Sequence, residues 1–126
     1  MKILLAEDDK NISLIAKLTL EQIGGHQVQV ATNGRRALEM ALNNDFDLIL
    51  LDEMMPEMNG LTMCREYYKK SDRPSPVIFL SAKSQDSDVK EFNQIALGFI
   101  LKPFDPATLC QSIIRILQKN TGAEAA

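Results

Sequence analysis

Five short apolar runs, separated by more polar sequence, recur along the chain. They lie at residues 3–6, 28–31, 48–51, 77–80 and 99–101. The clearest consists of four consecutive apolar residues, Leu48 to Leu51, and leads directly into Asp52. Continuous apolar runs of this length are typical of strands that are buried on both faces of a sheet. The pattern predicts five strands and raises the question of what meets Asp52, because carboxylates are rarely buried without a partner.

Segments with helical spacing of apolar residues fill the intervals between these runs. The first is expected over residues 11–23, before Gly24 and Gly25, the third after Asn59 and Gly60, and the fifth from Asp105, an N-cap followed by Pro106. The apolar residues that predict the five helices are, in order, Leu14, Ile15 and Leu18; Ala37, Leu38, Ala41 and Leu42; Leu61, Cys64 and Tyr68; Val89, Phe92, Ile95 and Ala96; and Cys110, Ile113, Ile114 and Leu117. Strict alternation of strands and helices predicts an α/β fold, with a parallel sheet covered by helices on both faces.

The composition is that of one domain of ordinary size. The chain has 126 residues, of which 45% are hydrophobic and 25% charged. A net charge of −3 and a pI near 5.1 argue against direct nucleic acid binding by this domain. No apolar run approaches the ~20 residues of a membrane span, and the N-terminus does not resemble a signal peptide, so we expect a cytoplasmic protein without a membrane partner. Residues 1–120 are expected to form the domain, and residues 121–126 a flexible tail or the start of a linker.

Histidine and cysteine are too scarce for several other kinds of site. The single histidine, His26, argues against a Ser-His-Asp catalytic site and against a histidine-rich metal site. Cys64 and Cys110 fall at apolar positions of predicted helices, so core packing is the expected role of both. Two cysteines do not make a disulfide framework.

Acidic residues follow two of the predicted strands. Glu7, Asp8 and Asp9 follow the first strand, and Asp52 and Glu53 end the third. Ligands of open α/β sheets bind beyond the carboxyl ends of the strands, so the acids converge there if these two strands are neighbours. Like charges held close together are unfavourable unless a cation neutralises them, and an all-oxygen ligand set favours Mg²⁺. The alternative is that some of these acids are helix N-caps, Asp9 above all.

Two further polar residues lie at the ends of other strands. Ser81 ends the fourth strand, and Lys102 follows the fifth. Taken singly, Ser81 fits a helix cap and Lys102 a solvated surface group. Together with the acids they match a phosphoryl-transfer site, which needs a metal, a carboxylate nucleophile and donors for the transferred oxygens.

Four motifs carry a resemblance to a known family. ILLAEDD at 3–9, LLDEMMPEMNG at 50–60, FLSAK at 79–83 and ILKPF at 100–104 resemble the receiver domain of two-component response regulators, over about residues 2–120. The resemblance implies a flavodoxin-like (βα)5 fold with strand order 2-1-3-4-5. It also implies a phosphorylation-activated signalling switch, which catalyses only its own phosphorylation and dephosphorylation.

The resemblance also implies the roles of the residues at the acidic edge. Asp52 falls on the phosphoryl acceptor, and Glu7 and Asp8 on the acidic pair, of which Asp8 is favoured as the direct metal ligand. The Mg²⁺ ion would be held by Glu7, Asp8, Asp52 and the backbone carbonyl of Met54. Pro56 and Gly60 fit the loop after the acceptor strand.

Ser81 and Lys102 fall on the family's hydroxyl and lysine positions, and the bond from Lys102 to Pro103 is expected to be cis. Phe99 falls on the aromatic position that changes rotamer between states. The switch would alter the surface of the fourth helix, fifth strand and fifth helix. The fourth helix has a thin apolar stripe, which fits either plain solvent exposure or a movable element.

The implied partners are a sensor histidine kinase or phosphotransfer protein, an output domain or effector protein, and a second copy in a phosphorylation-dependent homodimer. Met54 and Lys83 would flank the path of the water that hydrolyses the aspartyl phosphate. Neither offers general-base help, so slow self-dephosphorylation is expected, unless both are merely surface positions.

Three rival functions remain to be weighed against this one. An aspartate-nucleophile phosphatase would want a second acid two residues after the nucleophile, where this chain has Met54. A flavodoxin-like cofactor binder would need a loop rich in Gly, Ser and Thr after the first strand, where this chain has acids. An inactive receiver would act only as a docking module.

Overall fold

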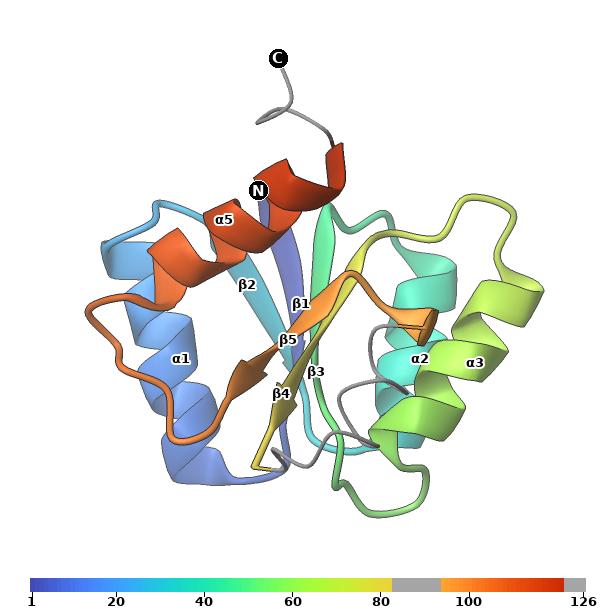
Figure 1. Cartoon of the computed structure of the whole chain (residues 1–126). Coiled ribbons are helices and arrows are strands. Elements are labelled where there is room, and N and C mark those ends of the chain that lie inside the picture. Colours follow the sequence, from blue (N-terminus) through green and yellow to red (C-terminus); the bar gives the residue numbers. More distant parts are fainter. Residues whose placement is uncertain (83–93, 122–126) are drawn as a thin grey trace.

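A five-stranded parallel sheet forms the centre of the protein (Figure 1). The computed structural model describes residues 1–82 and 94–121. The strands are β1 (Lys2–Ala6), β2 (Gln27–Ala31), β3 (Leu48–Asp52), β4 (Val77–Ser81) and β5 (Gly98–Leu101). Their order in the sheet is β2-β1-β3-β4-β5. The predicted α/β fold, the five strands and the 2-1-3-4-5 order are all confirmed.

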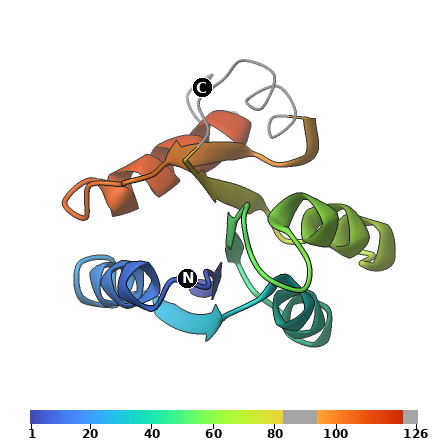
Figure 2. The ribbon, with the colours of Figure 1, turned by 90° about the horizontal axis from the view of Figure 1, so that it is seen from below.

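Helices cover both faces of the sheet (Figure 2). The described helices are α1 (Lys10–Gln22), α2 (Gly34–Asn43), α3 (Gly60–Lys70) and α5 (Leu109–Thr121). α1 and α5 pack on one face, and α2 and α3 on the other. Most of the predicted fourth helix, including Val89 and Phe92, lies outside the described residues, as do residues 122–126 of the predicted tail.

The three central strands are buried on both faces. Alternate residues of β3 point to opposite sides, so Leu48 and Leu50 pack against α1 and α5, and Ile49 and Leu51 pack towards α2 and α3. Every residue of β3 and β4 is buried, which explains why their sequences are continuously apolar up to the last residue. The strand ends hold the polar residues because only there does the chain leave the two layers of helices.

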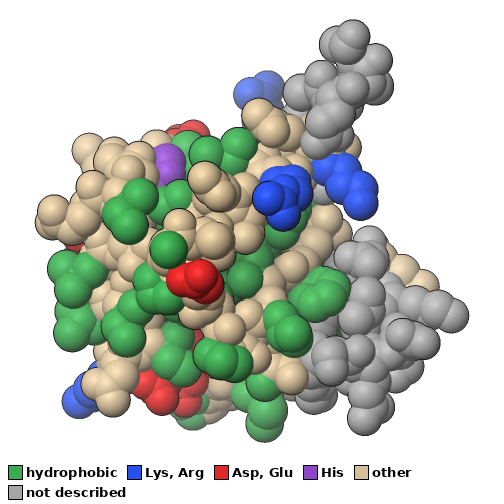
Figure 3. Space-filling model, turned by 60° about the vertical axis from the view of Figure 1, so that its left-hand side comes forward, with side chains coloured by type: hydrophobic (Ala, Val, Ile, Leu, Met, Phe, Trp, Pro, Cys, Tyr) green, Lys and Arg blue, Asp and Glu red, His purple; other side chains and the backbone are tan. Residues whose placement is uncertain are grey.

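The apolar residues that predicted α1 are not the ones it buries. Leu14, Ile15 and Leu18 are exposed, and the buried positions are Ala16, Thr19 and Leu20. Ala16 and Leu20 are one helical turn apart, and the small side chain of Ala16 lets the helix lie close to the sheet. The longer apolar side chains therefore remain on the surface, where Figure 3 shows hydrophobic groups scattered between polar ones.

The start of the fifth helix was predicted too early. α5 begins at Leu109 and not at Pro106. The Asp105 side chain does cap a turn, because Asp105 Oδ1 accepts a hydrogen bond of 2.9 Å from the backbone N–H of Ala107. The N–H of Thr108 then donates to the Asp105 carbonyl oxygen and closes that turn before the helix starts. The residues chosen as an N-cap thus stabilise a separate turn.

A tight loop joins β3 to α3. Asn59 is the N-cap of α3, and its side chain accepts a hydrogen bond from the N–H of Thr62. The helix begins at Gly60, one residue earlier than the sequence predicted. A Cβ atom on Gly60 would lie 2.3 Å from the carbonyl oxygen of Asp52, so only glycine fits here without moving the backbone. The loop therefore depends on Gly60 to bring the first turn of α3 against the end of β3.

No helix within residues 1–82 and 94–121 is both long and apolar enough to cross a membrane.

Candidate functional site

Three carboxylates meet at the carboxyl edge of the central strands. β1 and β3 are hydrogen-bonded neighbours in parallel, with Ala6 opposite Leu51, so the residues that follow Ala6 come level with Asp52. Oxygen atoms of Glu7, Asp8 and Asp52 lie within 4.8 Å of one another. Glu7 and Asp52 are buried, whereas Asp8 is exposed. The predicted convergence of these three acids is confirmed.

Lys102 neutralises part of this charge. Its Nζ atom lies 2.5 Å from Glu7 Oε1 and 3.0 Å from Asp52 Oδ1, and its side chain is only 15% exposed. The backbone N–H of Lys102 donates to the carbonyl oxygen of Ser81, which continues the pairing of β4 with β5 and directs the lysine towards the acids. The bond to Pro103 is cis, as expected. Asp52 therefore meets an ammonium group at the end of its buried strand.

Burial and charge change the proton affinity of two of these groups. Burial, together with the hydrogen bond and the negative charge of Asp52, raises the pKa of Glu7 to about 7, although Lys102 acts in the opposite direction. Burial alone would lower the pKa of Lys102, but its hydrogen bonds and charge interactions with Glu7 and Asp52 are together stronger, so its pKa is raised. Lys102 stays charged near neutral pH, and Glu7 exchanges its proton there.

The donor set fits a hard cation. All three carboxylates offer oxygen, and they line a solvent-accessible cavity of about 280 Å³ together with Met54 and Lys102. Glu7 Oε1 is fully buried, and among the described residues it contacts the Lys102 ammonium but has no further hydrogen-bond partner. Its coordination is thus incomplete in a way that a cation would remedy. The group can hold a metal ion of the Mg²⁺ type.

Asp9 stands apart from this cluster. Its Oδ1 accepts hydrogen bonds of 2.9 Å from the N–H of Asn11 and 3.0 Å from the N–H of Ile12, which makes it the N-cap of α1. The N-cap interpretation of Asp9 is confirmed. Its role is to start α1 directly beside the acids.

Glu53 is not one of the three clustered acids, although it lines the same cavity of about 280 Å³. The side chain is directed towards β4, where the Ser81 hydroxyl donates a hydrogen bond of 3.3 Å to Glu53 Oε2. Successive side chains of an extended chain point to opposite faces of the sheet, so Asp52 and Glu53 are directed to different sides of it. That alternation was the signal in the sequence that could have separated the two acids.

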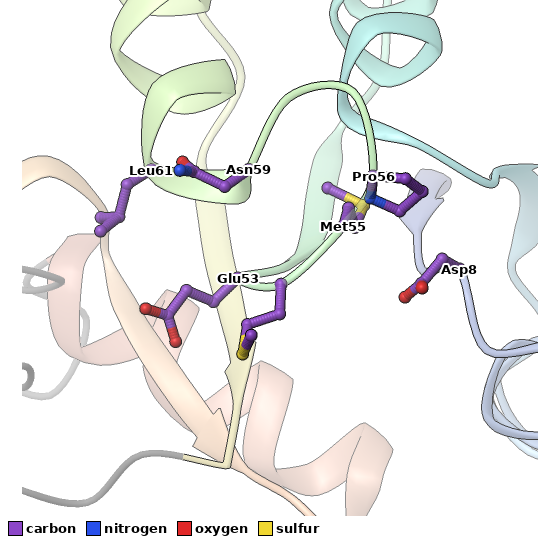
Figure 4. A pocket seen from close by; sticks show the side chains of 7 residues that line it. Asp8, Glu53, Met55, Pro56, Asn59 and Leu61 are labelled. Atoms are coloured by element: carbon purple, nitrogen blue, oxygen red, sulfur yellow. The ribbon is translucent and has the colours of Figure 1, made fainter.

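A second and larger cavity lies beside the first. It measures about 580 Å³, and Figure 4 shows Asp8 and Glu53 on opposite sides of it, with Met55 and Pro56 on the connecting loop. Met54 borders both cavities, and its side chain is 71% exposed. Its backbone N–H lies 3.4 Å from Asp52 Oδ1. The loop after β3 thus lies between two cavities at the same acidic edge.

Of the two remaining predicted residues, Phe99 and Lys83, only Phe99 belongs to the described part of the chain. Phe99 is partly buried in β5 and packs against the core cluster on the side of α2 and α3. Its change of rotamer stays a prediction. Lys83, predicted to flank the hydrolytic water, lies outside the described residues.

Known proteins have sequences similar to this one. The sequence model of the response regulator receiver domain matches residues 3–114. The response regulator ArlR of Staphylococcus saprophyticus is 38% identical over 120 residues, which cover 94% of this chain and 53% of that protein. The probable transcriptional regulator ycf29 of Pyropia yezoensis is 36% identical over 127 residues, covering 98% and 56%.

Solved structures of receiver domains are similar to the structure of this chain. The receiver domain of the Francisella response regulator 1452 superposes with a TM-score of 0.83 at 28% identity, covering 94% of this chain and 98% of that one. This chain spans about half the length of the curated relatives it matches. The chain belongs to the response regulator receiver domain family, the signalling switches of two-component systems.

Proposed function

We propose that Asp52 accepts a phosphoryl group from a histidine kinase or a phosphotransfer protein, and that this modification switches the protein between two states. The observation that supports the proposal best is the meeting of Glu7, Asp8 and Asp52 with the Lys102 ammonium at one edge of the sheet. Residues 1–120 would make up the phosphoacceptor domain, and residues 121–126 a tail or linker.

Asp52 is the best-placed nucleophile of the three acids. All three acids line the cavity of about 280 Å³, but Asp52 ends the central strand β3 and lies farther from Lys102 Nζ (3.0 Å) than Glu7 does (2.5 Å), and Asp8 is exposed to water. One carboxylate oxygen of Asp52 forms a bond to phosphorus while the bond from phosphorus to the leaving group of the donor breaks. The product is an aspartyl phosphate.

Glu7, Asp8 and Asp52 are the residues that would hold Mg²⁺, together with the backbone carbonyl of Met54. When bound, the ion supplies positive charge against the acids and the incoming phosphoryl oxygens. Asp8 is favoured over Glu7 as the direct ligand, because its carboxylate faces solvent and Glu7 already contacts Lys102.

Lys102 and Ser81 would bind the phosphoryl oxygens. The ammonium has three donors, so it can contact a phosphoryl oxygen while it stays paired with Glu7. Ser81 follows Leu80, the residue opposite Asp52 in the paired strands, so Ser81 lies at the same edge of the sheet as the acceptor. Movement of that hydroxyl would leave room for Phe99 to turn, which would change the surface around β5 and α5.

This change of surface would be read by a partner. The candidates are an output domain joined to the receiver, a separate effector, or a second phosphorylated copy. Direct contact with nucleic acid is not proposed for this domain, because its net charge is −3. Its chemistry would be limited to its own phosphorylation and dephosphorylation.

Intact mass spectrometry tests the proposal. Incubation with acetyl phosphate and Mg²⁺ is expected to add the mass of one phosphoryl group to the wild type and none to Asp52→Asn. Asp45→Asn removes an exposed carboxylate before the other end of β3 and serves as the matched control, which is expected to be labelled like the wild type. Labelling of Asp52→Asn, or full labelling in excess chelator, would contradict the assignment.

A further inference from the structure

Glu53 is a buried carboxylate that the chemistry above does not use. Glu53 is 7% exposed, and both its backbone N–H and its backbone carbonyl group are hydrogen-bonded. The N–H of Glu53 donates to the carbonyl oxygen of Leu80 at 3.3 Å, and its carbonyl oxygen accepts from the N–H of Gly60 at 2.8 Å. These bonds fix where the side chain starts, on the β4 side of the larger cavity (Figure 4).

The Glu53 carboxylate accepts a hydrogen bond from Ser81, whose hydroxyl is also needed for the proposed switch. Ser81 Oγ donates to Glu53 Oε2 at 3.3 Å, and both residues are buried. A serine hydroxyl has a single proton and can donate to one strong acceptor at a time. In the proposed function that proton must point to a phosphoryl oxygen on Asp52. The two acceptors therefore compete for one donor.

We infer that Glu53 is a positioning residue that holds the Ser81 hydroxyl in the unphosphorylated state and so opposes switching. The inference rests on the proposed function, because it needs the phosphoryl group on Asp52. When Ser81 turns to the phosphoryl oxygen, the buried carboxylate of Glu53 gives up this donor, which is unfavourable in a site of low polarity. The active state is thus less populated than the phosphoryl contacts alone would make it.

The length of the hydrogen bond between Ser81 and Glu53 sets the expected strength of this restraint. A distance of 3.3 Å is longer than the usual 2.7–2.8 Å of an O–H···O bond, so the restraint is modest although its acceptor is charged. We expect its removal to raise the affinity for a phosphoryl mimic by about threefold to tenfold, which is about 0.7–1.4 kcal/mol. A restraint of this size can be overcome by phosphorylation and still set a threshold for it.

Three substitutions separate the hydrogen bond from the charge. Glu53→Asp keeps the charge but shortens the side chain by one methylene, so it no longer reaches Ser81. Glu53→Gln keeps the reach and an accepting oxygen but loses the charge. Glu53→Met loses both and keeps the volume. Glu57→Gln removes an exposed negative charge from the same loop and is the matched control.

The assay is titration of each purified 126-residue chain with beryllium fluoride in saturating Mg²⁺, followed by the ¹⁹F signal of the bound mimic. Glu53→Asp and Glu53→Met are expected to bind about threefold to tenfold more tightly than the wild type. Glu53→Gln is expected to stay within about twofold, because the neutral amide still accepts from Ser81, although more weakly. Glu57→Gln is expected to match the wild type.

The same series in a Ser81→Ala background gives the decisive comparison. Without the hydroxyl, all variants at position 53 are expected to bind the mimic equally, since the coupling is between Glu53 and Ser81. An increase that persists in Ser81→Ala, or a Glu53→Gln effect as large as that of Glu53→Met, would mean charge repulsion and would overturn the inference. Unchanged binding in both Glu53→Asp and Glu53→Met would also overturn it.

Failure of the proposed function would look different. In that case the wild type itself would show no Mg²⁺-dependent binding of the mimic, and Asp52→Asn would behave like it. If one variant at position 53 does not fold, as judged by its circular dichroism, the other still decides between the two outcomes. Both Glu53→Asp and Glu53→Met remove the hydrogen bond by independent routes.

Discussion

Replacement of Lys102 by methionine removes the positive charge between two buried carboxylates. Lys102 Nζ lies 2.5 Å from Glu7 and 3.0 Å from Asp52, and the methionine side chain fills a similar volume without the ammonium. In the absence of metal, the variant must keep two acids close together with less compensation. We expect Lys102→Met to be destabilised, by an amount that depends on pH.

The expected loss of stability follows from the two carboxylates that are left without the ammonium. Removal of one partner of a buried ion pair typically costs about 3–5 kcal/mol. Lys102 is still 15% exposed, and Glu7 can take up a proton because its pKa is about 7, so the lower end applies. We expect a loss of about 3 kcal/mol at pH 8. At pH 5.5 Glu7 already carries a proton in the wild type, and the loss falls to about 1 kcal/mol, the value of one hydrogen bond to Asp52.

Urea unfolding in chelator, followed by far-ultraviolet circular dichroism, measures this difference. With a slope of roughly 1.5 kcal/mol per molar urea, the midpoint is expected to fall by about 2 M at pH 8 and by less than about 1 M at pH 5.5. Lys70→Met is the matched control. Lys70 Nζ lies 3.7 Å from Glu66 Oε2, with the lysine side chain 54% and the glutamate side chain 34% exposed. Loss of such a surface pair is expected to change stability by less than about 1 kcal/mol.

Two results would refute the reasoning. One is an equal loss at both pH values, which would mean that the charge of Glu7 does not contribute. The other is a loss at pH 8 no larger than that of Lys70→Met. Mg²⁺ offers an independent check: it is expected to stabilise the variant more than the wild type, because the ion and the ammonium compete for the same oxygens.

Three further predictions concern the same edge of the sheet. The pKa of Glu7 is raised from 4.5 to about 7, so the folded state holds this proton more tightly than the unfolded state. The contribution of Glu7 to metal-free stability is therefore greatest below pH 4.5 and is expected to fall by up to about 3 kcal/mol as pH rises through 7; urea titrations of Glu7→Gln should lack this fall. Gly60→Ala would place a Cβ atom 2.3 Å from the Asp52 carbonyl oxygen and is expected to cost about 2 kcal/mol and to slow labelling by acetyl phosphate; normal labelling and stability would show that the loop can yield. Met54→Asn combined with Lys83→Glu is expected to shorten the lifetime of the aspartyl phosphate severalfold, measured as decay of the phosphorylated mass, and equal or slower decay would count against a role for these side chains in excluding water.

The sequence by itself determined the layers of the fold and the place of its site. Apolar runs such as 48–51 lie in strands covered on both faces, and nothing but a sheet between two helical layers satisfies several of them at once. The carboxyl ends of parallel strands share one edge, so Glu7, Asp8 and Asp52 were expected to meet there. The motifs supplied the strand order that makes β1 and β3 neighbours, which periodicity alone does not contain.

The tertiary structure decided which polar groups act together. Asp9 and Glu53 are as acidic as their neighbours, yet Asp9 caps α1 and Glu53 pairs with Ser81. In α1, the exposed Leu14 and Leu18 predicted a helix correctly but not its buried side. A pattern along the chain states how far apart residues are in sequence, whereas a hydrogen bond or an ion pair requires a match within a few tenths of an ångström. That match depends on where the neighbouring strand and helix lie, and only packing of the whole chain sets it.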